Sequence, residues 1–201
     1  MKADEIVLIL LKMDHVHYKF HKPFNCLSQF IYEGKRKGSK HLIGEYYDFA
    51  EGTMAIGRLD ENSEGLLLLT TDGKVSAAVR SAKYEKEYYV QVQGEISEEA
   101  IQKIALGVEI GFNGIKYRTK PCKAWQIEKP THLPMEDRKV KNEDHGSCSW
   151  LAIVIKEGKF RQVRKMTAAV GFPTLRLVRY RIGTFTLNLP VRGVEQIEIK
   201  L

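Results

Sequence analysis

A charged tetrad directly before an apolar ladder is the feature of this sequence best suited to chemistry. The stretch GRLDENSEGLLLLTTDG, residues 57–73, begins with Gly-Arg-Leu-Asp and continues into four consecutive leucines. In an extended segment Arg58 and Asp60 point to one face, and Leu59 points to the other. A cation and a carboxylate then meet at the rim of a sheet. This pattern is typical of a catalytic site or, taken alone, of an exposed ion pair that contributes little stability.

Lys86 and Tyr88 form a second pair, because alternate residues of the strand-like stretch KEYYV lie on one face. An aromatic ring beside an ammonium group is suited to stacking on a nucleotide base and contacting its phosphate. The alternative is an ordinary cross-strand aromatic residue in a sheet. For the pair taken alone, the ordinary cross-strand residue is the favoured interpretation.

The densest basic region lies in EGKFRQVRKM, residues 157–166, and in the segment that follows it. Arg161, Arg164 and Lys165 fall at positions i, i+3 and i+4, so a helix would present them on one cationic face. Such a face is typical either of phosphate binding or of a solvated helix surface. Further basic residues extend the region: Lys159, Arg176, Arg179 and Arg181.

These residues need strands and helices that position them, and the hydrophobic pattern predicts both. Strands are expected at residues 17–22, 54–59, 65–71, 87–96, 149–155 and 174–183. The last twenty residues predict a short strand pair. Residues 110–127 predict a hairpin that turns at Asn113-Gly114 and has a long second strand.

Helices are expected at residues 74–82, 98–106 and 158–171. Ser97 is a good N-cap for the second of these, and Gly107 is a stop signal. Strands and helices alternate irregularly along the chain. This order predicts an α+β fold with a mixed, mostly antiparallel sheet flanked by helices.

Three segments outside these elements also carry information. Residues 33–40 read as a basic, glycine-containing loop, and residues 128–147 as a polar surface loop that is expected to be flexible. The apolar run at residues 6–13 is too short to span a bilayer and follows acidic residues. A buried strand or a packed N-terminal segment is therefore expected there, in preference to a signal peptide.

Composition and charge narrow the class of protein. The chain has 201 residues, of which 43% are hydrophobic, which suits one large domain or two small lobes that share a cleft. A net charge of +7 favours an anionic partner, with nucleic acid ahead of membrane, although a merely soluble basic protein is the alternative. Cys26, Cys122 and Cys148 are far apart, which indicates reduced thiols in a cytosolic setting. The histidines lack metal-binding spacing, so no metal site is expected.

Together, and in this order, the motifs resemble those of the pseudouridine synthases, in the branch that acts on small- and large-subunit ribosomal RNA. GRLDENSEGLLLLTTDG resembles the signature around the catalytic aspartate, and KEYYV resembles the second motif. EGKFRQVRKMTAAVGFPTLRLVRYRIG resembles the third motif, in which an arginine meets that aspartate. HKPFNCLSQF, residues 21–30, resembles the Lys-Pro segment that opens the catalytic domain. The resemblance covers residues 17 to 190.

The resemblance implies the fold of this family, with a central catalytic cleft. Residues 1–201 are expected to form a single catalytic domain of two lobes sharing that cleft, without a separate N-terminal RNA-binding module. This feature and the stretch MTAAVGFPTLRLVRY indicate one particular large-subunit subtype. A cytoplasmic monomer is expected, with large-subunit ribosomal RNA as its partner and without metal, membrane or cofactor.

The resemblance also implies a reaction, the isomerisation of uridine to pseudouridine. Asp60 is the expected catalytic carboxylate, acting on either the ribose or the uracil ring, and Arg164 is the expected partner that orients it. Tyr88 is expected to pack on the flipped-out uracil, and Arg58 to occupy the space that the base leaves. The remaining expected contacts to RNA are Lys86, Lys159, Arg161, Lys165, Arg176 and Arg179.

Two other classes of function compete with this interpretation. A non-catalytic RNA-binding or ribosome-assembly protein could keep the same scaffold and charge. Binding alone does not require Asp60, Tyr88 and Arg164 together, which favours the enzyme. A DNA-binding regulator would need a second helix at helix-turn-helix spacing, and the pattern predicts none. Lys159 and Phe160 stand where the family usually has arginine and asparagine, so the third motif does not name the target uridine.

Overall fold

The fold is known from a computed structural model. It describes residues 15–32, 34, 38, 40–81, 83–112, 114–136, 140 and 146–200. The apolar segment at residues 6–13 lies outside the described residues. The expected loops at 33–40 and 128–147 are described only in part.

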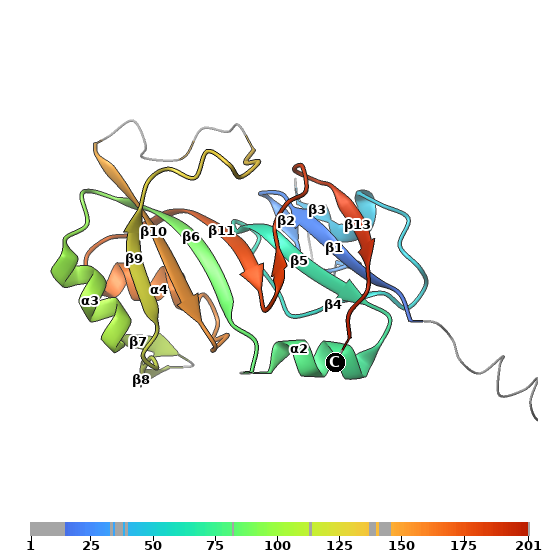
Figure 1. Cartoon of the computed structure of the whole chain (residues 1–201), viewed down its shortest axis with the longest axis horizontal. Coiled ribbons are helices and arrows are strands. Elements are labelled where there is room, and N and C mark those ends of the chain that lie inside the picture. Colours follow the sequence, from blue (N-terminus) through green and yellow to red (C-terminus); the bar gives the residue numbers. More distant parts are fainter. Residues whose placement is uncertain are drawn as a thin grey trace, which may run out of the picture.

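Within the described part of the chain, nine strands form one continuous sheet (Figure 1). The order along the sheet is β13-β1-β5-β11-β6-β10-β9, with β4 paired to β5 and β12 paired to β11. The strands are β1 (His17–Lys22), β4 (Met54–Ala55), β5 (Glu64–Thr70), β6 (Lys86–Gln93), β9 (Lys123–Ile127), β10 (Cys148–Ile155), β11 (Thr174–Ile182), β12 (Phe185–Thr186) and β13 (Val194–Ile197). Two short sheets stand apart: β2 (Cys26–Leu27) with β3 (His41–Leu42), and β7 (Glu109–Phe112) with β8 (Ile115–Arg118).

The two halves of the large sheet meet where β5 runs parallel to β11. The described neighbours in this sheet otherwise pair antiparallel, which confirms the predicted mixed, mostly antiparallel sheet. At the junction Gly65 has a φ of +103°, and a Cβ atom there would lie 2.5 Å from the carbonyl oxygen of Arg179. Only glycine permits both this dihedral angle and this close approach of two backbones.

Two of the three α-helices in the described part of the chain begin at side-chain caps that the local sequence provides. The helices are α2 (Gly73–Arg80), α3 (Glu98–Leu106) and α4 (Gln162–Ala169), with a short 3-10 helix at Ile43–Glu45. The Asp72 carboxylate accepts a hydrogen bond from Lys74 N at 2.7 Å. The Ser97 hydroxyl accepts one from Ala100 N at 3.3 Å, as predicted. No helix among the described residues is long and apolar enough to cross a membrane.

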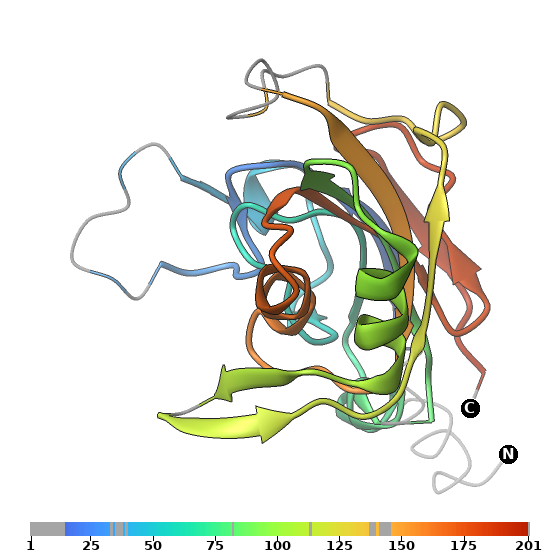
Figure 2. The same cartoon turned by 90° about the vertical axis from the view of Figure 1, so that its left-hand side faces the viewer.

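Separate apolar clusters stabilise the two halves of the sheet. On one half, α3 and α4 lie on the same side of β6 and β10 and share a core with them (Figure 2). On the other half, α2 packs against β5 and β11, while β1 and β5 bury their opposite faces against aromatic side chains. The parallel junction lies between these cores, so residues placed there are held by both halves.

Several predicted boundaries are wrong. The strand expected at 54–59 ends at Ala55, because the chain turns at Gly57, whose φ is +71°. The hairpin's second strand ends at Arg118, shortly before Pro121, and β9 leaves it to join β10 in the large sheet. The two strands near the C-terminus pair with β11 and β1 and not with each other.

The basic strand and helix also differ from the prediction in detail. The helix expected from residue 158 begins at Gln162, because Arg161 adopts a left-handed φ of 52°. β11 contains register shifts between Thr174 and Arg176 and between Arg179 and Arg181. These irregularities explain why apolar and basic residues alternate imperfectly along this strand.

Candidate active site

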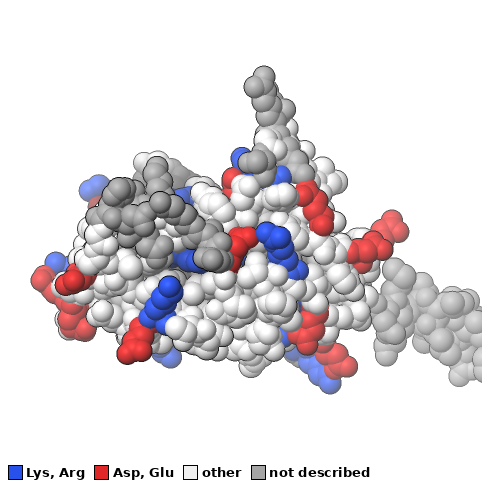
Figure 3. Space-filling view, turned by 90° about the horizontal axis from the view of Figure 1, so that it is seen from above, with Lys and Arg blue, Asp and Glu red and all other residues white. Residues whose placement is uncertain are grey.

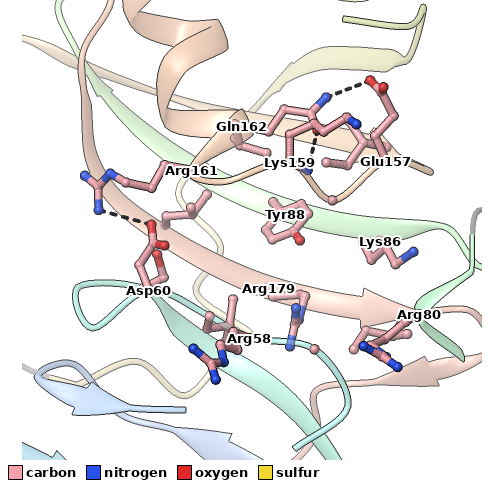
Figure 4. A pocket seen from close by; sticks show the side chains of 18 of the residues that line it. Arg58, Asp60, Arg80, Lys86, Tyr88, Glu157, Lys159, Arg161, Gln162 and Arg179 are labelled. Carbon is pink, nitrogen blue, oxygen red and sulfur yellow. Dashed lines mark hydrogen bonds and ion pairs between the residues drawn. The ribbon is translucent and has the colours of Figure 1, made fainter. Parts of the chain in front are cut away.

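A pocket with a volume of about 220 Å³ opens at the central junction of the sheet (Figure 4). Clefts that bury drug-sized ligands measure roughly 300–1,000 Å³, so this pocket suits a smaller group. Seven of the ten predicted site residues line it: Arg58, Asp60, Lys86, Tyr88, Lys159, Arg161 and Arg179. Three motifs that are far apart in the sequence therefore converge on one cavity.

The loop that carries Asp60, residues 57–63, is attached firmly to the core. Leu59 is buried, and its backbone is held by one side chain: the Ser28 hydroxyl donates to Leu59 O at 2.9 Å and accepts from Leu59 N at 3.0 Å. Arg58 and Asp60 both line the pocket, on either side of this anchored leucine. Leu59 is buried as predicted, although it also lines the pocket between these two residues.

Lys22 holds the same loop from inside the protein. Its side chain is fully buried, and Nζ donates to the carbonyl oxygens of Pro23 at 2.9 Å, Glu61 at 3.3 Å and Ser63 at 2.6 Å. Burial lowers the pKa of Lys22 to about 8. The sequence indicated this residue only as part of the Lys-Pro segment. Its role in the structure is to fix the backbone on the far side of Asp60.

Two arginines converge on one oxygen of Asp60. Arg161 Nη1 lies 3.2 Å from Asp60 Oδ2, and Arg164 Nε lies 3.6 Å from the same atom. Arg164 also donates through Nη2 to Asn62 O at 2.7 Å and to Ser63 Oγ at 3.2 Å. The structure thus brings the predicted pair together and adds a second guanidinium. The two cations neutralise the carboxylate and restrict its rotamer.

The turn that presents Arg161 is held by a network around Glu157. Gln162 accepts a hydrogen bond from Lys159 N at 3.1 Å and donates to Glu157 Oε2 at 2.8 Å. Burial raises the pKa of Glu157, but hydrogen bonds from Tyr117, Lys120 N and Gln162 outweigh it and lower that pKa below its usual value. Such contacts are needed because the left-handed conformation of Arg161 is unfavourable for a side chain with a Cβ atom.

Tyr88 faces the pocket from β6, and Arg179 lies beside it on β11 (Figure 4). The two residues are register partners, and Tyr88 packs against the core cluster of α3 and α4. Arg179 is only 4% exposed, and its Nε donates to Leu66 O at 2.7 Å. A buried, hydrogen-bonded guanidinium therefore lies beside the Tyr88 ring in the pocket.

Of the other predicted RNA contacts, one lines the pocket, one lies on α4 outside the lining, and one is buried in the protein interior. Lys86 lines the pocket while donating to Ser81 O at 3.1 Å, and burial lowers its pKa. Lys165 lies outside the lining, on α4, and donates to Gly111 O at 2.8 Å. Arg176 is not brought to the pocket, because it is 7% exposed and forms a bidentate pair with Glu64 at 2.8 Å.

Several lining residues were not singled out from the sequence, among them the polar residues Ser63, Arg80, Glu157 and Gln162. Arg80 ends α2 and donates to Ser76 O, an ordinary helix-terminal contact with no distinguishing pattern. Glu157 and Gln162 belong to the third motif, whose spacing could have indicated them. Among the described residues, no cluster of histidine, cysteine, aspartate and glutamate is placed to hold a metal ion.

The surface does not concentrate the positive charge on the face seen in Figure 3, where basic and acidic side chains are interspersed. Some basic residues of β11 are neutralised internally, since Arg181 pairs with Glu87 at 2.7 Å and with Glu85 at 3.3 Å. The cations that remain near Asp60 line or border the pocket. Positive charge is therefore not a general property of the face seen in Figure 3.

A sequence profile described as RNA pseudouridylate synthase matches residues 16–169, which span all the elements that build the pocket except β11. The chain belongs to this family. It is a pseudouridine synthase, an isomerase, as the motifs predicted. The order of the motifs along the chain and their convergence on one pocket agree with this assignment.

Similar proteins support the same assignment. "Ribosomal large subunit pseudouridine synthase E" of Vibrio parahaemolyticus is 42% identical over 171 residues, covering 84% of this synthase and 68% of the relative. The protein of the same name from Xanthomonas axonopodis pv. citri is 37% identical, covering 83% and 85%. This is the subtype that the sequence indicated. A crystal structure of a pseudouridylate synthase superposes with a TM-score of 0.70 at 26% identity, over 92% of this chain and 71% of that one, which confirms the predicted fold.

Proposed function

We propose that this synthase isomerises a specific uridine of large-subunit (23S) ribosomal RNA to pseudouridine, with Asp60 as the catalytic carboxylate. The relatives that carry a large-subunit name support the substrate class. The observation that carries the proposal is the Asp60 carboxylate, held by two arginines on an anchored loop in the same pocket as Tyr88. Binding RNA would not require this arrangement, whereas nucleophilic or elimination chemistry would.

The reaction breaks the bond between N1 of uracil and C1′ of the ribose, rotates the base, and forms a bond between C5 and C1′. The proton on C5 is then lost to solvent and N1 takes up a proton, so the product is an isomer of the substrate. Asp60 acts as the nucleophile or as the carboxylate that assists elimination at the ribose. Arg164 and Arg161 hold its Oδ2 in position throughout. Tyr88 is placed in the pocket for proton transfer at C5.

The target uridine must leave its stack before it can reach Asp60. Base extrusion costs a few kcal/mol, which contacts in the pocket and at its rim must offset. Tyr88 packs on the extruded uracil, and the exposed Arg58 occupies the space that the base leaves. Lys86, Lys159 and Arg161 are lining cations suited to the flanking phosphates.

The composition of the pocket also bears on how many copies of the chain form the active enzyme. Both halves of the sheet contribute lining residues, which supports a single catalytic unit. We propose that one copy of the chain suffices, that it works in the cytoplasm where ribosomal RNA is made, and that the isomerisation needs no cofactor. Sedimentation of the active protein with its RNA tests the first of these statements.

The decisive experiment measures tritium release from large-subunit ribosomal RNA labelled at C5 of uridine. Asp60→Asn is expected to lower the single-turnover rate by about 10⁴-fold or more, as for other essential catalytic groups. Glu61→Gln is the matched control, because Glu61 lies on the same loop and pairs with Lys40 at 3.3 Å. Release by Asp60→Asn at the parental rate overturns the role of Asp60. Absence of release by the parent protein overturns the proposed substrate. Mapping pseudouridines in cells with and without the chain then identifies the position.

A further inference from the structure

Phe160 is a large aromatic residue that the fold leaves in water. It is 66% exposed, although Gly158, Lys159, Arg161 and Gln162 around it all line the pocket. Single exposed apolar residues are common on protein surfaces, so exposure alone carries no inference. The position of Phe160 beside the pocket is the informative observation. The residue directly before the arginine that contacts Asp60 presents a ring to solvent at the rim of the pocket.

The ring of Phe160 is fixed beside a cation. Lys165 Nζ lies 5.2 Å from the ring centroid and donates to Gly111 O at 2.8 Å, so the ammonium is held between the β7–β8 hairpin and Phe160. A second pair of the same kind involves the preceding residue, with Lys159 Nζ 5.1 Å from the centroid of the Tyr117 ring. Two cation–aromatic pairs therefore connect the turn before α4 and the helix itself to the β7–β8 hairpin. We call Tyr117, Lys159, Phe160 and Lys165 the rim platform.

The rim platform is braced from within the protein. Tyr117 donates a hydrogen bond to the Glu157 carboxylate, and Lys120 N donates to the same carboxylate at 2.9 Å. Gln162 donates to it at 2.8 Å from the first turn of α4. The hairpin, the turn and the helix are therefore tied to one carboxylate, so the platform is preorganised and needs little ordering when a ligand binds.

The chemistry of the platform selects a nucleotide over other ligands. An aromatic face stacks on any base, and adjacent ammonium groups attract the phosphates on either side of it. The Glu157 carboxylate, the acidic group at the centre of the network, is already occupied by protein donors. A protein or lipid partner would require a wider apolar surface than one ring provides.

We propose that Phe160 stacks on a base adjacent to the flipped-out uridine, with Lys159 and Lys165 contacting its phosphates. The platform would thus take part in choosing which uridine is modified. This inference rests on the proposed function, because it needs an RNA substrate in the pocket.

The test compares Phe160→Ala, Phe160→Leu and Phe160→Trp in two assays with unmodified large-subunit ribosomal RNA. Filter binding gives the Kd, and tritium release at saturating enzyme gives the rate of the bound complex. Loss of one base stack is expected to raise the Kd of the alanine variant by about 5- to 150-fold. Tryptophan is expected to restore parental binding, whereas leucine is not, because stacking requires a flat ring. Trp125→Ala, which removes a 43% exposed aromatic on the edge strand β9, is the matched control.

Three results would decide against the platform. Parental affinity in Phe160→Ala overturns it, and so does full rescue by leucine, which would indicate apolar contact without stacking. An equal loss of affinity in Trp125→Ala overturns it as well, because the effect would then not be specific to the rim. If the parent binds this RNA but releases no tritium, the proposed function fails, while the Kd values still decide the stacking contact.

Discussion

At the scale of single residues, the two arginines on Asp60 are not equivalent. The Arg164 side chain is 11% exposed and is also bound to the backbone of the Asp60 loop, whereas the Arg161 side chain is 39% exposed. An exposed ion pair contributes about 0–1 kcal/mol, and the partly buried pair of Arg164 and Asp60 is expected to contribute more, because water and salt screen it less. Arg164 is therefore the one that positions the carboxylate.

Substitution of the two arginines should separate these roles. Arg164→Met is expected to lower the single-turnover rate of tritium release by about 100-fold or more, and Arg161→Met by about 10-fold or less. Arg164→Lys should not rescue the rate, because a single ammonium cannot reach Asp60 and Asn62 O together. Equal losses in the two methionine variants would contradict this difference.

Lys22 makes stability depend on pH. Its pKa of about 8 in the folded protein is below the ordinary value for lysine. The unfolded chain therefore binds more protons between pH 8 and about 10.4, and stability rises with pH across that window. Relative to Lys22→Met, which cannot titrate, the parent should gain about 2 kcal/mol in its free energy of unfolding between pH 7.5 and 9.5. Urea unfolding of both proteins at the two pH values measures this gain, and a pH-independent difference would refute it.

At the scale of elements, the parallel junction of β5 and β11 places the site. Asp60 belongs to the loop before β5, Arg179 to β11, and Tyr88 to β6 on the other side of β11. The junction brings these residues together only because Gly65 lets the two backbones touch. Any atom inserted there must displace the strand that carries Arg179.

Gly65→Ala should therefore disturb both stability and activity. The added Cβ meets backbone atoms of Arg179 at a positive φ, and we expect a loss of about 3 kcal/mol or more in the free energy of unfolding. Gly73→Ala is the control, since none of the described residues places an atom within 4 Å of a Cβ at that position in α2. Alanine there should be neutral or stabilise the protein by about 0.4–1 kcal/mol. Urea denaturation of both variants gives the comparison, and a harmless Gly65→Ala would contradict the close approach.

At the scale of the whole molecule, the positions of the positively charged side chains decide which of them can contact RNA. The net charge of +7 is distributed among buried pairs, mixed surfaces and the pocket. When RNA binds, counterions are released only by cations that contact phosphates. The slope of log Kd against log salt therefore reports how many such contacts form.

Lys86 and Lys200 should differ in this respect. On single-stranded RNA each phosphate contact changes the slope of log Kd against log salt by about 0.7. Lys86→Gln is expected to reduce the slope by that amount, because Lys86 lines the pocket. Lys200→Gln should leave it unchanged, because Lys200 lies near the C-terminus, paired with Glu198 and 87% exposed. Filter binding between 50 and 200 mM salt measures both slopes, and identical slopes in the two variants would argue against Lys86 as a phosphate contact.

The sequence by itself determined the local elements and the identity of the chemistry. Ser97 and Asp72 cap helices because capping involves residues only a few positions away. The motif around Asp60 was recognisable because residue types and spacing within one segment carry it. Sequence also predicted that Leu59 is buried between two residues facing the pocket, since alternation is a property of a short extended stretch.

The resemblance indicated Arg164, but only the tertiary structure decided which of the other arginines belong to the site. Arg161 and Arg176 looked alike as members of one basic region, but Arg161 contacts Asp60, 101 residues away, whereas Arg176 is buried against Glu64, 112 residues away. Such contacts depend on which strands pair and in which direction, and local propensity contains no information about pairing over these separations. The parallel junction, the buried Lys22 and the rim platform were unpredictable for the same reason.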